Sequence, residues 1–197
     1  MPLAAPAPPD QLRRDARDNR AAILDAAREL FADSADVAMC QVARRAGVGQ
    51  GTLYRHFAGR SALVAELLDE HVARIEALAA AEAGEPDAFF VLLRSLVDRM
   101  VDLYGLAVLA RHDVETDSQL KRSRQRIREL LAVPLRDAKA AGTLRRDVSL
   151  DDVFLIFAMG RGAMEGLPDR AARSAVAHRM LALILSGVEQ PVLAPPA

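Results

Sequence analysis

Apolar residues in most of this chain recur every three or four positions, the spacing of one face of an α-helix. Within residues 15–32, a stripe of this kind is formed by Ile23, Ala27, Leu30 and Phe31, and charged residues lie outside it. We find no clear segment in which apolar and polar residues alternate, and no internal repeat. The pattern therefore predicts an all-α protein of about nine helices.

Glycine and proline divide this pattern into separate helices. Gly47 stands where the first of two short helices must end, and the stretch 84–87 (GEPD) is the best domain boundary. Pro134 is expected to bend or fray a long helix, and Ser149 with Asp152 has the spacing of a capping box. The expected helices cover about residues 15–32, 39–46, 50–57, 60–83, 88–104, 106–113 and 118–140, followed by one after Ser149 and one over 170–188.

Composition limits the class of protein further. The single cysteine, Cys40, excludes an internal disulfide and indicates a reducing compartment, which we take to be the cytoplasm. No run of about 18 uncharged apolar residues is present, so we expect no membrane span. The first ten residues lack the basic start and apolar core of a secretory signal. Because both ends are rich in proline, residues 1–14 are expected to be a disordered tail and residues 191–197 a loose one.

Charge along the chain is unevenly distributed. Residues 37–65 hold four arginines and no carboxylate, although the formal net charge of the whole chain is −1. A small cationic surface on two short helices joined by a glycine turn suits a polyanion, and the spacing indicates duplex DNA. On the second short helix, Gln50 can bond adenine, and Tyr54 and His56 can donate to phosphate. An architectural DNA-binding protein is the weaker reading, because it would need a far more basic chain.

The motif GVGQGTLYRHF, preceded by VARRA and by AAILDAARELFAD, resembles the TetR family of transcriptional regulators over about residues 17–68. The resemblance implies that the second short helix reads DNA and that Arg60 contacts phosphate. Ala38 stands where the family usually has Thr or Ser opening the bracing helix, and losing that cap should cost about 1 kcal/mol. The expected DNA contacts are Arg44, Arg45, Gln50, Thr52, Tyr54, Arg55, His56 and Arg60.

The resemblance also implies a division of the chain and a mode of action. It places a helix-turn-helix DNA-binding domain at residues 15–60, a linking helix at 61–83 and a ligand-binding and dimerisation domain at 84–190. We expect a homodimer on a pseudo-palindromic operator, with half-sites about 34 Å apart, that acts as a repressor until a small-molecule effector releases it. The last two helices should supply the dimer surface, with Ala158, Gly162, Gly166, Val176, Met180, Leu183 and Ile184.

Bulky and charged residues of the larger domain are candidates for the ligand pocket. They are Met100, Tyr104, His112, Phe154, Phe157 and Arg161, although plain core packing explains the Met and Phe positions as well. Arg161 is a lone charge in an apolar run, so its burial would require a partner such as an acidic ligand or Glu165. An ion pair at the dimer edge explains Arg161 equally well. The basic run at 121–128 is interpreted as a solvated helix face.

An enzyme is the main rival class. The four histidines are scattered, and none has metal-ligand spacing with another histidine or with Cys40. The chain contains no glycine-rich phosphate loop and no nucleophile elbow. We therefore expect a transcriptional regulator without catalytic activity, metal or cofactor. The alternative is an all-helical small-molecule-binding protein or enzyme with a degenerate helix-turn-helix, and a redox role for Cys40 stays open.

Overall fold

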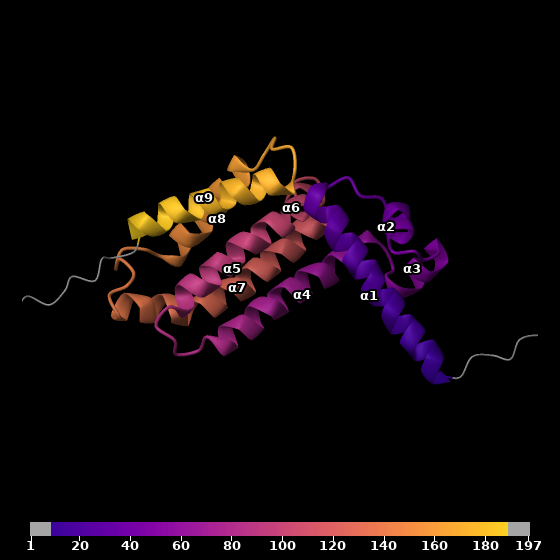
Figure 1. Ribbon diagram of the computed structural model, residues 1–197, viewed down its shortest axis with the longest axis horizontal. Coiled ribbons are helices and arrows are strands. Elements are labelled where there is room, and N and C mark those ends of the chain that lie inside the picture. The colour runs from indigo at the N-terminus through magenta and orange to yellow at the C-terminus, as the bar shows by residue number, and fades with distance from the viewer. Residues whose placement is uncertain (1–8, 189–197) are drawn as a thin grey trace, which may run out of the picture.

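The computed structural model describes residues 9–188, which form nine α-helices and no strand (Figure 1). The all-α prediction is confirmed. None of these helices is both long and apolar enough to cross a membrane. The helices are α1 (Pro9–Asp33), α2 (Met39–Arg45), α3 (Gln50–His56), α4 (Arg60–Ala81), α5 (Ala88–Asp102), α6 (Tyr104–Leu109), α7 (Val114–Ala140), α8 (Leu150–Ala163) and α9 (Arg170–Val188).

Three details of the helix pattern differ from the expectation. α1 begins at Pro9, so residues 9–14 of the expected tail are helical, because proline is well tolerated in the first position of a helix. α7 begins four residues early at Val114, since the Asp113 side chain caps it by accepting from the Glu115 N–H at 3.1 Å. α7 also continues through Pro134 as one helix. The remainder of both expected tails lies outside the described residues.

A first hydrophobic core holds α1, α2, α3 and the first half of α4 together. Leu53 of α3 is fully buried there, beside Val42 and Ala43 of α2 and Ile23 of α1. The apolar stripe of the first helix thus faces the two short helices, as its spacing predicts. Members contributed by α4 are Leu63, Val64, Leu67 and Leu68.

A second, larger core lies among α4, α5, α7, α8 and α9, which form the elongated left part of the molecule in Figure 1. Val72 and Ile75 belong to the second half of α4 and join this second core. α4 therefore contributes one half of its length to each core. A shift of α4 would change the packing of both cores.

α6 connects the two parts through a very close helix contact. A Cβ atom on Gly105 would lie 2.1 Å from the Phe31 carbonyl oxygen and 2.4 Å from that of Ser34, at the end of α1. Only glycine permits this approach, because no carbon atom fits at such distances. Leu106, the next residue, is buried in the first core. The larger domain thus rests directly on α1.

Candidate nucleic-acid interface and ligand cavity

The turn between α2 and α3 fixes the angle at which the two helices meet. Gly47 adopts a φ of +68°, a conformation that strains any residue with a side chain. The Val48 N–H donates to the Ala43 carbonyl at 3.0 Å, and the Gly47 N–H donates to the Arg44 carbonyl at 3.2 Å. These two bonds form a Schellman motif, which ends α2 and turns the chain toward α3.

The start of α2 partly replaces the missing Thr or Ser cap. Ala38 has no side-chain oxygen to accept from the first helical N–H groups. The Gln41 side chain, however, accepts from the Ala38 N–H at 2.7 Å, which is the reciprocal half of a capping box. One free backbone donor is therefore satisfied, without an acid near the face expected to meet DNA.

One side of α3 faces the core, and the opposite side faces solvent. Leu53 is buried, whereas Gln50 and Arg55 are exposed and Tyr54 is 51% exposed. Thr52 and His56 are half-buried at the edges of this surface. Arg55 donates to the Thr52 hydroxyl at 2.9 Å, which orders two of the expected DNA contacts relative to each other.

Three arginines on and beside the two short helices have different surroundings. Arg44 is exposed, and its side chain has no hydrogen bond or ion pair with any described residue. Arg45 donates to the Glu29 carboxylate on α1 at 2.7 Å, and Arg60 donates to the Val37 carbonyl, just before α2. The charge of Arg44 is thus uncompensated by the described residues, while Arg45 and Arg60 hold the two short helices against their neighbours.

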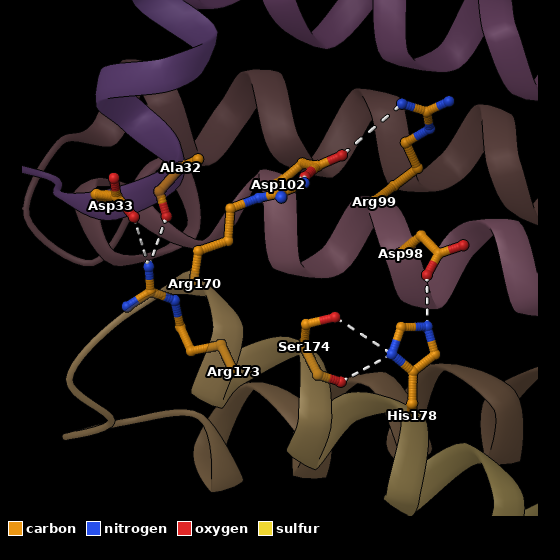
Figure 2. Close-up of polar contacts among 9 residues, drawn as sticks. All are labelled: Ala32, Asp33, Asp98, Arg99, Asp102, Arg170, Arg173, Ser174 and His178. Carbon is orange, nitrogen blue, oxygen red and sulfur yellow. Dashed lines mark hydrogen bonds and ion pairs between the residues drawn. The ribbon is translucent and has the colours of Figure 1, made fainter.

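A buried arginine connects α9 with the end of α1 (Figure 2). Arg173 is 2% exposed, and its Nη2 donates to the Ala32 carbonyl at 3.0 Å and to the Asp33 carboxylate at 3.1 Å. Its guanidinium carbon lies 4.6 Å from the centroid of the Tyr104 ring. The last carbonyls of a helix carry partial negative charge and attract such a cation. Arg170 forms a parallel ion pair with Asp102 of α5.

A serine, a histidine and an aspartate also meet between α5 and α9. His178 Nε2 lies 2.8 Å from the Asp98 carboxylate, and its Nδ1 lies 2.9 Å from the Ser174 carbonyl and 3.2 Å from the Ser174 hydroxyl (Figure 2). A carbonyl oxygen can only accept, so Nδ1 carries a hydrogen toward it and cannot take one from the hydroxyl. The cluster fastens two helices and does not have the order of a nucleophilic triad.

A cavity of about 100 Å³ lies among α4, α5, α7 and α8. Its walls are mainly apolar and include four of the six expected pocket residues: Met100, Phe154, Phe157 and Arg161. The other two lie elsewhere, since the Tyr104 ring packs against Arg173 and His112 is exposed after α6. Sequence reasoning missed the walls from α4 and α7, which are Leu68, His71, Leu120, Ser123, Arg124 and Ile127.

His71 is the buried polar residue that α4 contributes to this cavity. Burial, together with the positive charges of Arg99 and Arg74, lowers the pKa of His71 to about 4, although Asp102 acts in the opposite direction. The imidazole is therefore neutral at physiological pH. Neutrality removes the cost of placing a charge beside the apolar walls.

α8 and α9 together present an apolar surface to solvent. Leu155 and Met159 of α8 and Leu183 of α9 are each more than half exposed. The expected dimer residues Ala158, Gly162 and Gly166 are also exposed, and Val176 and Ile184 are half-buried. Met180 is also half-buried, and the end of its side chain packs against Gly160 of α8, where a Cβ would stand.

Two short helices joined by a glycine turn, with an acid-free exposed face on the second, define a helix-turn-helix DNA-binding protein. Comparison with known families agrees. Residues 23–67 match the family described as bacterial regulatory proteins, tetR family, and residues 85–190 match the C-terminal domain of SbtR-like transcriptional regulators. The chain belongs to the TetR family of transcriptional regulators, with an N-terminal DNA-binding helix-turn-helix and a C-terminal ligand-binding domain.

Individual relatives extend over most of the chain. The TetR transcription regulatory protein from Mycobacterium vanbaalenii is 33% identical, with a TM-score of 0.62 over 91% of this chain and 99% of that one. The regulator SCO0520 from Streptomyces coelicolor is 30% identical, with a TM-score of 0.65 over 88% and 99% of the two chains. The HTH-type transcriptional regulator UidR of Escherichia coli (strain K12) is 26% identical over 151 residues, which cover 71% of this chain and 76% of UidR.

Proposed function

We propose that this regulator is a homodimeric repressor that binds a pseudo-palindromic operator through α3 and leaves it when a small effector enters the cavity beside α4. The observation that carries this proposal is the acid-free, solvent-facing side of α3, held at a fixed angle by the Gly47 turn. Gln50 can select bases, while Tyr54 and Arg44 can bind phosphate. As a DNA-binding regulator it would act in the cytoplasm, and we assign it no catalytic role.

The exposed apolar surface of α8 and α9 supports the homodimer. Leu155, Met159 and Leu183 would be costly to leave in water, and a second copy of the same surface can cover them. A two-fold pair would present two α3 helices to successive major grooves on one side of the duplex, about 34 Å apart. This arrangement explains why one short recognition helix suffices for each subunit.

α4 supports release by an effector, because it belongs to both hydrophobic cores and also lines the cavity. A ligand that favours a different position of α4 would move the first core, which carries α3. Such a ligand acts only because it binds the DNA-free state of the protein more tightly than the DNA-bound state. The usual coupling free energy between effector binding and DNA binding is about 1–3 kcal/mol. Because α4 joins the two cores, we divide the chain into a DNA-binding domain at 15–60, a linking helix at 61–83 and a ligand-binding domain from residue 84 onward.

Selection of genomic DNA fragments by the purified protein tests the proposal. We expect enrichment of a pseudo-palindrome, and a gel shift with two subunits per site. Gln50→Ala should change which operator sequence is preferred, whereas Tyr54→Ala should weaken binding to all sequences. If the wild-type protein binds none of the tested duplexes at low salt, the proposed function is wrong.

A further inference from the structure

Apolar residues, among them Leu96, Ile127 and Phe157, form most of the wall of the cavity beside α4. Arg124 and Arg161 also line this cavity, and we call the part of the wall that they form the cationic end. A second cavity of about 280 Å³ shares this cationic end. The two cavities share Ala107, Leu120, Arg124 and Arg161, and the second adds Ala110, Arg111, Asp117, Ala158 and Gly162.

The acids near this cationic end are already bound to other residues. Glu165 accepts from Arg111 through both carboxylate oxygens, at 2.8 and 3.3 Å. Asp117 is paired with Lys121 at 2.6 Å. Glu165 therefore does not neutralise Arg161, although it is the nearest acid in the sequence.

The side chains of Arg161 and Arg124 have no hydrogen bond or ion pair with any residue that the structure describes. Arg161 is half-buried, and its pKa is lowered by that burial first and then by the positive charges of Arg124 and Arg111. Half-burial reduces the hydration of the Arg161 guanidinium, and no carboxylate of the described residues compensates its charge. An anion bound by Arg161 and Arg124 would supply that compensation.

We propose that the effector is a small organic acid whose apolar body occupies the cavity beside α4 and whose carboxylate is bound by Arg161 and Arg124. This inference rests on the proposed function, which makes the cavity the effector site. A planar guanidinium binds a carboxylate through two parallel hydrogen bonds. The cavity of about 100 Å³ is smaller than one of about 150 Å³ that holds benzene, so a short apolar chain of about six carbon atoms suits it as a probe.

Calorimetric titration of the purified full-length protein with four probes tests the charge and the apolar part separately. The probes are hexanoate, hexan-1-ol, hexylamine and acetate. We expect hexanoate to bind at least tenfold more tightly than the alcohol or the amine, and acetate to bind at least tenfold more weakly than hexanoate. Equal binding of hexanoate and hexan-1-ol, or no binding of hexanoate, would overturn the inference.

Two variants assign the charge to its residues. Arg161→Met should lower the affinity for hexanoate at least tenfold and leave the affinity for hexan-1-ol unchanged. Arg124→Gln serves the same purpose if the first variant does not fold. Arg122→Met is the control, because Arg122 is exposed on α7, the helix that carries Arg124, and lines neither cavity. If Arg161 instead pairs with a second subunit, Arg161→Met should dissociate the dimer without changing hexanoate affinity, and the inference is then wrong.

A gel shift of the ligand-free protein in the same preparation separates this inference from the proposed function. Intact DNA binding without any hexanoate binding overturns only the assigned effector chemistry. If the ligand-free protein binds no duplex although the titration shows that it binds hexanoate, the proposed repressor function is wrong and the effector chemistry stands.

Discussion

At the scale of single residues, neighbours in the sequence have different physical roles. Arg44 and Arg45 are adjacent on α2 and identical in chemistry, yet only Arg45 has an acidic partner, Glu29. Residue type and spacing alone cannot separate them. The ion pair is formed with a residue sixteen positions away, on another helix, and depends on how α1 packs against α2.

This difference predicts unequal effects on DNA binding. In the proposed dimer, Arg44→Ala should remove one phosphate contact from each subunit and reduce the magnitude of the slope of log affinity against log salt by about 1.8, which is about 0.9 for each phosphate. Arg45→Ala should change the slope less, because Glu29 already compensates its charge. Fluorescence anisotropy with one operator duplex across a salt series measures both slopes. Equal slopes for the two variants would contradict the prediction.

His71 provides a second prediction at this scale. Its pKa falls from 6.5 to about 4 on folding, so between these values the unfolded chain binds a proton that the folded protein does not. The contribution of neutral His71 to the free energy of unfolding is therefore present above pH 6.5 and is lost as the pH falls toward 4. Between pH 7 and pH 5, the free energy of unfolding should fall by about 2 kcal/mol for this reason.

Denaturant unfolding at several pH values measures this effect. His71→Leu should flatten the pH dependence of the free energy of unfolding between pH 5 and pH 7. His112→Gln is the control, because His112 is exposed, and its curve should follow the wild type. An unchanged slope in His71→Leu would show that the titrating group lies elsewhere.

At the scale of elements, much of the fold was predictable because helices carry local signals. The apolar stripe of α1, the glycine after α2 and the capping box of α8 each predict a boundary or a buried face. The expectation at Pro9 was wrong, since the same residue that breaks a helix interior is compatible with a first turn. At Pro134, α7 does not end but continues as one helix.

The long-range contacts of the site had no such signal. Arg60 binds a carbonyl 23 residues away, and Arg173 binds one 141 residues away. The cavity walls from α4 and α7 depend on the crossing of two helices distant in the sequence. The exposed side of α3 was predictable because it follows from helical spacing alone, whereas these partners follow only from tertiary packing.

The contact between α6 and α1 allows a prediction at the element scale. Gly105→Ala would place a carbon atom against two carbonyl oxygens of α1, so α6 must move or the first core must open. Overpacking of this kind costs about 1–3 kcal/mol. Gly187→Ala is the control, because nothing lies within 4 Å of its Cβ position. Thermal unfolding of both variants checks the difference, and equal melting temperatures would contradict the close contact.

At the scale of the whole molecule, we expect the outer surface of α8 and α9 to form the contact between two subunits. Leu155→Asp should convert the proposed dimer to a folded monomer, because the residue is 57% exposed and contributes little to the subunit core. Operator affinity should fall with it, since the two half-sites would no longer be bound together. Light scattering after gel filtration gives the mass of each variant.

Val133→Asp is the matched control for that experiment. Val133 is 51% exposed and belongs to α7, which is not one of the two helices of the proposed pairing surface, so its replacement should leave the mass unchanged. A wild-type protein that is already monomeric would exclude this pairing surface.

The buried guanidinium of Arg173 has a consequence for regulation without any effector. In the proposed dimer, α9 would carry part of the pairing surface, and through Arg173 it also binds the end of α1. A change in the orientation of one subunit relative to the other would therefore move α1 and the two short helices packed on it. Substitutions in the subunit contact should thus alter promoter occupancy even in the protein without effector.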